Sequence, residues 1–507
     1  MTVTYLLYKE PFRPQYHFTP SRHWMNDPNG MVYYEGEYHL FYQHHPESSV
    51  WGPMHWGHAV STDMVNWEHL PIAFCPDEHG AIFSGSAVVD WNDSSGFFHG
   101  GHGLVAIFTH HDEDSSGRVR QRQSLAYSRD KGRSWEMYAH NPVLSDTEIV
   151  DFRDPKVIWH ASSQKWIMSL AANDHIRFYS SPDLLEWAFE SSFGHDDGNH
   201  DAVWECPDLF ELAVEGQQGV SKWVLLVSVG DDPNVPEGSR TQYFIGQFDG
   251  QRFVCEDEPD TVRWLDDGRD NYAGVTFSDL PPTDGRRILM GWMSNWKYAN
   301  LTPTEAWRGS MTLPRELKLL HGETGTELIQ VPVKELEQLR ADHTQWSEVP
   351  VMPGVNPVRQ VEGRQLEIIA QFEPGDASEF GFRLRLSDRE ETVVGYRVQD
   401  AELFVDRTRS GETAFHPAFA AEHSTALSLQ SGKLYMRMFI DWSSIEVFGN
   451  EGQVVMTDLI FANPNSTGVE VYSKGGTARL ISLDVYQMKS VYDTGQQEVA
   501  STLAATR

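Results

Sequence analysis

The sequence is poor in cysteine and has no long apolar segment. Only three cysteines occur among its 507 residues, Cys75, Cys206 and Cys255, so neither a disulfide framework nor a cysteine cluster for zinc is expected. No apolar run approaches the ~18–20 residues of a membrane helix, and the start, MTVTYLLYKEPFRPQYHF, lacks the charged and apolar regions of a signal peptide. We therefore expect no membrane contact and a cytoplasmic protein, or a secreted one if a leader was removed before this sequence begins.

Basic residues are also scarce. The 40 Lys and Arg stand against 73 Asp and Glu, which gives a formal net charge of −33. A field of this sign repels nucleic acid and anionic membranes and favours a neutral or cationic ligand, although solubility alone would also explain it. The 22 histidines show no spacing typical of a metal site. We expect no nucleic-acid partner, no metal and no other cofactor.

Helical periodicity is rare. Short β-branched or aromatic runs separated by Gly, Pro, Asn and Asp dominate instead, which indicates an all-β protein. Five apolar runs recur with starts roughly 57–66 residues apart, and each is expected to be a strand. They are YHLFYQ (38–43), LVAIFTH (104–110), KWIMSLAA (165–172), KWVLLVSV (222–229) and RILMGWM (287–293).

A second repeated feature follows the first three of these runs. It combines Ser, Asp and, a few residues later, Trp, at 61–67, 128–135 and 181–187, and a looser relative occurs at 248–253. The Asp and Ser side chains can close a tight turn, and the aromatic ring can pack that turn onto the sheet. Five such units predict a five-bladed β-propeller. The alternative is an array of β-sandwiches whose periodicity is accidental.

The repeat stops near 315–320, and different patterns follow. Residues 331–343 have helical character and suggest a linker, whereas from about residue 350 strand-like alternation resumes with new content. We therefore predict a propeller over 1–330, a linker over 331–349, a β-sandwich over 350–492 and a loose tail over 493–507. The sandwich carries no acid-rich motif, so structural support is its first expected role and sugar binding its second. An exposed sandwich face could pair two copies as a homodimer.

Three of the segments that precede the apolar runs carry an acidic residue beside or close to a proline. The first strand of a propeller blade lines the central channel, so Asp27, Asp154 and Glu205 are expected to point into one funnel from three blades. Asp27 and Asp154 directly precede a proline, and Glu205 precedes one at one remove. Turn capping or pairing with Arg153 is the structural alternative for any one of them. Three buried carboxylates at matching positions are costly unless they are paired or used in chemistry.

Paired carboxylates suit the hydrolysis of glycosidic bonds. One must stay ionised at the anomeric carbon, while the other keeps a proton for the leaving oxygen. Carboxyl groups ~5–5.5 Å apart predict retention of configuration, and ~6.5–9.5 Å predicts inversion.

The motifs around these acids are specific. HWMNDPNG (23–30), FRDP (152–155) and WECPDLF (204–210) resemble the three signatures of glycoside hydrolase family 32, which includes invertases, levanases and exo-inulinases. Further agreement, in YHLFYQHHP, FSGSAVV, GWMSNW, WRGSMTLPREL and DWSSIEVFGN, extends the resemblance over nearly the whole chain. The resemblance implies a five-bladed propeller joined to a C-terminal β-sandwich, and retention of configuration. It further implies Asp27 as nucleophile, Glu205 as general acid and then base, and Asp154 as a residue that grips fructose hydroxyls and stabilises the transition state.

The resemblance also implies a set of substrate contacts. These are Trp24, Asn26, Gln43, Trp51, Phe83, Ser84, Arg153 and Trp292, with Trp296 as an alternative to Trp292. The expected substrates carry a terminal β-fructofuranosyl unit: sucrose, fructooligosaccharides, or fructans of the levan and inulin type. A non-catalytic fructan-binding propeller, a fructosyltransferase of the same family and a five-bladed glycosidase for arabinan or xylan are the alternatives.

Overall fold

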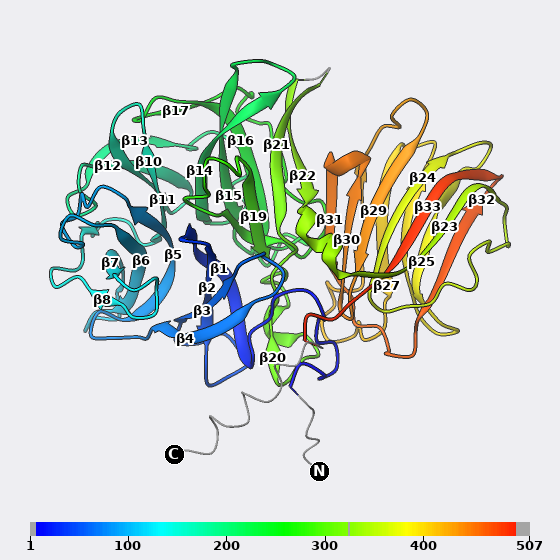
Figure 1. The fold of residues 1–507 in the computed structure, drawn as a ribbon, viewed down its shortest axis with the longest axis horizontal. Helices are drawn as coiled ribbons and strands as arrows, with labels where there is room; N and C mark the ends of the chain where they lie inside the picture. The colour runs from blue at the N-terminus through cyan, green and yellow to red at the C-terminus, as the bar shows by residue number, and fades with distance from the viewer. Residues whose placement is uncertain (1–6, 323–324, 493–507) are drawn as a thin grey trace, which may run out of the picture.

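The computed structural model describes residues 7–322 and 325–492, and β-strands form almost all of its regular structure (Figure 1). Within these ranges the helices are three short 3₁₀ turns, η1 (Ala299–Leu301), η2 (Lys334–Leu339) and η3 (Asn450–Gly452). None of the helices in this part of the chain is long and apolar enough to cross a membrane. The tail predicted over 493–507 lies outside the described residues.

Five antiparallel blades span residues 23–332, which confirms the predicted propeller. Blade 1 contains β1 (His23–Tyr34), β2 (Glu37–His45), β3 (His55–Ser61) and β4 (Glu68–Phe74), with β20 (Trp307–Arg308) beside β1. Blade 2 contains β5 (Ala81–Asp90), β6 (Gly103–Glu113), β7 (Val119–Ser128), β8 (Glu136–Met137) and β9 (Leu144–Ser145). Blade 3 contains β10 (Phe152–His160), β11 (Lys165–Ala172), β12 (His175–Ser181) and β13 (Ala188–Phe193).

The last two blades share one hydrogen-bonded sheet. Blade 4 contains β14 (Trp204–Glu215), β15 (Ser221–Val229), β16 (Arg240–Phe248) and β17 (Phe253–Cys255). Blade 5 contains β18 (Tyr272–Thr276), β19 (Arg287–Trp292), β21 (Arg315–Gly322) and β22 (Gly325–Pro332). The five apolar runs of the sequence coincide with β2, β6, β11, β15 and β19, the second strand of each blade. Apolar clusters fill the space between neighbouring blades, so each of these blades packs against its neighbour through apolar side chains.

The repeated Ser, Asp and Trp residues close the turn after the third strand of blades 1 to 3. In blade 1, Asp63 accepts hydrogen bonds from Ser61 Oγ and from the N–H groups of Val65 and Asn66, while Trp67 Nε1 donates to the carbonyl of Met64. The same Trp-to-carbonyl bond recurs from Trp135 and Trp187. The turn chemistry predicted from the sequence is therefore present in each blade that carries the motif.

A two-layer β-sandwich follows the propeller and lies beside it (Figure 1, yellow-green to red). One sheet contains β23 (Arg340–Val351), β33 (Ala478–Met488), β24 (Leu366–Glu373), β29 (Leu434–Ile440), β30 (Ser444–Gly449) and β31 (Val454–Leu459), in that order. The other contains β28 (Glu422–Ala426), β27 (Glu402–Arg409), β26 (Glu391–Arg397), β25 (Glu379–Leu386) and β32 (Gly468–Lys474). Alternating residues of both sheets fill the space between them with one apolar core.

The stretch 331–349 is only partly the linker that its sequence suggests. After η2, residues from Arg340 onward form β23, which pairs along its length with β33 at the edge of the sandwich. The physical reason is that an edge strand with both faces largely in water needs no alternating apolar residues. RADHTQWSEVPV is accordingly mostly exposed and gives little strand signal.

Buried ion pairs join the sandwich to the propeller. Arg315 of β21 contacts Glu446 of β30 at 2.6 Å and Asp266 at 3.0 Å, and all three side chains are buried. His17 bridges Asp441 at 2.8 Å and Glu446 at 2.9 Å. Pairing of this kind satisfies charges that would be costly to bury alone. The two domains therefore meet through specific polar contacts as well as apolar packing.

Candidate active site

A β-bulge interrupts the first strand of every blade at the same level. In β1, Asn26 and Asp27 lie between the paired residues Met25 and Pro28, so two residues oppose the single residue Gln43 of β2. Equivalent irregularities follow Ile82 in β5, Arg153 in β10, Glu205 in β14 and Tyr272 in β18. A bulge bends a strand and re-aims its side chains. These five bulges therefore set the direction of the side chains at one end of the propeller channel.

Backbone conformation at the bulges supports this interpretation. Asp154, Cys206 and Ala273 each have a positive φ, of 65°, 46° and 53°. Non-glycine residues rarely occupy this region, and it is enriched at functional sites.

The bulges open onto one pocket of about 330 Å³, within the size range of small-molecule sites. Nine of the eleven residues predicted for catalysis or substrate binding line it. They are Asn26, Asp27, Gln43, Trp51, Phe83, Ser84, Arg153, Asp154 and Glu205. The three acids thus come from blades 1, 3 and 4 to one cavity, as their positions in the sequence predict.

Asp27 lies at the base of the pocket and accepts hydrogen bonds on both oxygens. Asn26 Nδ2 donates to Oδ1 at 3.0 Å, and Ser84 Oγ donates to Oδ2 at 2.7 Å. Burial raises the pKa of Asp27, the hydrogen bond from Ser84 opposes this rise, and the charge of Glu205 adds to it. Trp24 Nε1 donates to Asn26 Oδ1 at 2.7 Å and so fixes the orientation of the Asn26 amide. The donors around Asp27 favour its carboxylate form.

Asp154 is held from the neighbouring blade. The backbone N–H of Cys206 donates to Asp154 Oδ2 at 3.0 Å, and Cys206 Sγ lies 3.5 Å from both Asp154 Oδ2 and Asp27 Oδ2. Burial raises the pKa of Asp154 to about 7, and the charges of Glu205 and Asp27 add to the rise although Arg153 opposes it. Carboxylates this close cannot all be ionised at little cost. Burial and the neighbouring charges of Glu205 and Asp27 thus favour the protonated form of the Asp154 carboxyl more than in a free aspartate.

Glu205 is bound on both oxygens. Arg153 donates to Oε1 from Nη2 at 2.8 Å and from Nε at 3.2 Å, and the Tyr272 hydroxyl makes a hydrogen bond to Oε2. Arg153 is itself held by an ion pair with Asp151. The Tyr272 hydroxyl donates to Glu205, so donors from blades 3 and 5 hold the two carboxylate oxygens of this blade 4 residue. Its side chain is 21% exposed, so it remains accessible from the pocket.

Aromatic rings form one wall of the pocket. Phe83 stacks on His111 with ring centroids 4.2 Å apart and planes at 4°, and Trp51 meets Phe83 edge-on at 6.2 Å. Trp51 is 44% exposed, at the mouth. Flat apolar faces of this kind suit the C–H faces of a sugar ring.

Two of the predicted substrate contacts lie behind this wall. Trp24 and Trp292 are fully buried and do not line the pocket, whereas Trp296 does. Trp292 packs against Trp296 with ring centroids 4.8 Å apart, and Trp24 packs against both. The prediction of Trp292 as a pocket residue is therefore replaced by Trp296. The reason is that Trp292 is the last residue of β19 and points into the core, while Trp296 follows in the loop.

Sequence reasoning missed several residues of the pocket. His111 and Gln121 of blade 2 line it, as does Asp151, which directly precedes the FRDP motif. Tyr272, in the first strand of blade 5, is buried and contacts Glu205. Only His111 and Asp151 adjoin segments that the sequence singles out, the apolar run 104–110 and FRDP.

Family models account for both domains. The model of the glycosyl hydrolases family 32 N-terminal domain matches residues 17–332, and that of the family 32 C-terminal domain matches 335–487. The chain belongs to glycosyl hydrolase family 32. This confirms the resemblance carried by the NDP, RDP and ECPD motifs.

Relatives of this family 32 chain agree over its length. It is 52% identical over 492 residues to the levanase of Bacillus subtilis (strain 168), covering 96% of this chain and 72% of the relative. It is 40% identical over 504 residues to a levanase of Bacillus sp. (strain L7), of which it covers 53%, and 96% of this chain is aligned. With an extracellular exo-inulinase of Aspergillus awamori it shares 36% identity over 530 residues, 97% of this chain and 98% of the relative.

Solved structures of similar proteins have the same fold. The crystal structure of exo-inulinase from Aspergillus awamori superposes with a TM-score of 0.88 at 34% identity, covering 96% of this chain and 100% of that one. The β-fructofuranosidase from Schwanniomyces occidentalis, complexed with fructosyl-erythritol, gives 0.84 at 29% identity, covering 96% and 99%.

Proposed function

We propose that this protein is a β-fructosidase that releases terminal β-D-fructofuranosyl units from sucrose, fructooligosaccharides or fructans. The observation that carries this proposal is the meeting of Asp27, Asp154 and Glu205 in one pocket with aromatic walls. Its relatives are named levanase and exo-inulinase, which supports the same substrate class. The net charge of −33 is compatible with a neutral sugar.

In the proposed mechanism, Asp27 attacks C2 of the fructosyl unit while Glu205 gives a proton to the departing oxygen. The bond from C2 to the leaving group breaks as the bond from C2 to Asp27 forms. Water then gives a proton to Glu205 and attacks C2, which releases fructose and restores the Asp27 carboxylate. Two displacements retain the configuration.

Asp154 has a different proposed role, because its Oδ2 is already held by the Cys206 N–H. Its carboxyl group accepts hydrogen bonds from fructose hydroxyls, which position the ring. Arg153 joins Asp154 to Glu205, with its Nε 3.9 Å from Asp154 Oδ2. It therefore sets the distance between the ring-binding and proton-donating groups.

The alternatives are less well supported. A non-catalytic fructan-binding propeller would not need three carboxylates in one pocket, two of them buried and each held by its own donors. Fructosyl transfer uses the same first step, with an acceptor sugar in place of water, so it is a side reaction of the same site at high substrate concentration.

Hydrolysis of sucrose, inulin and levan by the purified chain tests the proposal, with fructose release followed by chromatography. Glu205→Gln and Asp27→Asn are expected to lower kcat by about 10²–10⁴-fold or more, since each removes a group that acts in the chemical step. Glu215→Gln is the matched control: it lies in the same strand, is 50% exposed and contacts Lys318 at 3.4 Å. Near wild-type turnover by Glu205→Gln would refute the assignment, and α-fructofuranose as first product by NMR would refute retention.

Two further predictions accompany this function. Pairing of two copies through an exposed sandwich face is measured by light scattering coupled to size exclusion. The cytoplasmic or secreted location predicted from the sequence is measured by fractionation of the source cells. The relative from Aspergillus awamori is named extracellular.

A further inference from the structure

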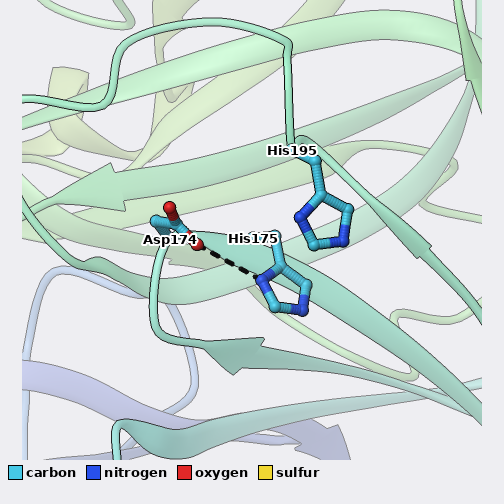
Figure 2. Close-up of side chains that lie close together, drawn as sticks. All are labelled: Asp174, His175 and His195. Atoms are coloured by element: carbon cyan, nitrogen blue, oxygen red, sulfur yellow. Dashed lines mark hydrogen bonds and ion pairs between the residues drawn. The ribbon is translucent and has the colours of Figure 1, made fainter.

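Two histidines and an aspartate come together on blade 3 (Figure 2). Asp174 and His175 lie where the hairpin between β11 and β12 ends, and His195 follows β13. One ring nitrogen of each histidine and one oxygen of Asp174 all lie within 4.8 Å of one another. Neither the proposed hydrolysis nor the pocket lining uses these three residues. Twenty positions separate the two histidines in the sequence, so the cluster cannot be predicted from a short motif.

The contacts within the cluster leave it open to a ligand. His175 Nδ1 lies 3.4 Å from Asp174 Oδ1, and the rings of His175 and His195 lie 4.1 Å apart at 31°. His195 Nε2 is 3.3 Å from Ser192 Oγ. His175 is 8% exposed, whereas Asp174 and His195 are exposed. The fold therefore fixes the position of His175, whereas the exposed side chains of Asp174 and His195 can rotate toward it.

The donor set selects a class of ion. Imidazole nitrogens suit Zn²⁺, Cu²⁺ and Ni²⁺, while Mg²⁺ and Ca²⁺ prefer an all-oxygen shell. Metal–nitrogen bonds of about 2.0–2.1 Å place the ligand atoms of a tetrahedral zinc site about 3.3 Å apart. The observed spread, within 4.8 Å, is wider than this value, so binding requires the ligand side chains to move closer together. Three protein ligands leave the fourth position for water.

We propose that Asp174, His175 and His195 bind a divalent transition-metal ion, with zinc as the representative ion. This proposal departs from the expectation of no metal site, which rested on spacing along the chain. The ion is separate from the three acids and takes no part in the displacement at C2.

The position of the site gives the ion a structural consequence. Asn173, the neighbour of Asp174, accepts hydrogen bonds from the Asp151 N–H on its side-chain oxygen at 3.2 Å and from the Trp204 N–H on its carbonyl at 2.8 Å. Asp151 pairs with Arg153, and Trp204 precedes Glu205. A metal ion would tie the β11–β12 hairpin to the segment 194–203. It would thus stabilise the segment 194–203, which precedes Glu205 in the chain.

Isothermal titration of the purified full chain with ZnCl₂ tests the proposal, after chelator treatment and desalting. Wild type is expected to bind about one equivalent, while His195→Ala and Asp174→Asn bind at least about tenfold more weakly. His99→Ala is the matched control, because His99 is an exposed loop histidine of blade 2 outside the cluster. His195 and Asp174 are exposed, so both variants are expected to fold, which thermal unfolding without metal checks.

A second readout uses stability. Zinc is expected to raise the Tm of wild type and His99→Ala, but not of His195→Ala, because only an ion that binds the folded state stabilises it. Mg²⁺ at equal concentration should leave every Tm unchanged. Absence of zinc binding to wild type, or equal binding by wild type and His195→Ala, would overturn the site. Because binding is measured directly, either result is independent of whether the chain hydrolyses fructosides.

Discussion

The backbone N–H of Cys206 donates to Asp154 Oδ2 at 3.0 Å, so the residue after Glu205 on blade 4 fixes the carboxylate of blade 3. The positive φ of both residues makes this approach possible. Each acid in the pocket is thus oriented by groups from elsewhere, which is how a site reaches fixed geometry before substrate binds.

Ser84→Ala is expected to move the acid limb of kcat/KM to higher pH. The Ser84 hydrogen bond lowers the pKa of Asp27, so its loss raises that pKa, and a nucleophile must be ionised. A larger protonated fraction at acidic pH then means less activity there. The pH dependence of sucrose hydrolysis measures the shift. Ser86→Ala, in the same strand but bonded to the carbonyl of Pro155, should leave the limb in place; equal shifts in both variants would contradict the prediction.

Trp296→Ala is expected to weaken substrate binding, whereas Trp292→Ala is expected to weaken the stability of the fold. Trp296 lines the pocket, so its loss should raise KM for sucrose about tenfold, the equivalent of ~1.4 kcal/mol of binding. Trp292 is fully buried, so its truncation should lower the free energy of unfolding by about 3–5 kcal/mol. Steady-state kinetics and thermal unfolding of both variants separate the two roles. A large KM effect with unchanged stability in Trp292→Ala would reverse the assignment.

Arg315→Met is expected to destabilise the contact between the domains by about 3–5 kcal/mol, because it removes the arginine that neutralises the buried Asp266 and leaves only His17 as an ion-pair partner of Glu446. Chemical unfolding followed by tryptophan fluorescence measures the loss. Arg479→Ala serves as control, since this exposed arginine pairs with Glu373 and Glu348 at the surface and its removal should leave the midpoint nearly unchanged.

Stability should fall as pH rises from about neutral to alkaline, through His17. Burial alone would lower the pKa of His17, but its hydrogen bonds to Asp441 and Glu446 outweigh burial and raise the pKa from 6.5 to about 9. The folded state therefore holds a proton that the unfolded state releases above its own pKa. The contribution, roughly 3 kcal/mol, is complete below the unfolded pKa and is lost as pH passes through the folded pKa. Tm measured across this window should decline in wild type and decline less in His17→Gln.

The sequence predicted the propeller because each blade repeats an apolar second strand, and a repeated pattern is strong evidence even where each copy is short. It predicted the convergence of Asp27, Asp154 and Glu205 because first strands line a propeller channel. It could not rank Trp292 against Trp296, since the end of β19 decides which ring faces the core.

Other features of the structure could not be predicted from the sequence. Edge strand β23 lacks apolar alternation because water covers most of its side chains. Arg315 and Glu446 stand 131 positions apart, and only folding shows that they pair. The same holds for His175 and His195, whose proximity depends on how blade 3 packs.

At the bulge near the start of each first strand, two residues oppose one. The side chains that line the pocket can therefore change there without changing the pairing that builds the blade. Beyond the bulge, each first strand pairs with the second strand in regular register, apart from a second irregularity between Asn29 and Val32 in β1. This pairing does not depend on which side chain occupies the extra position. A blade can therefore exchange an acid for Phe83 and Ser84, or for Ala273, without altering its own pairing. New specificities can arise one blade at a time on an unchanged frame.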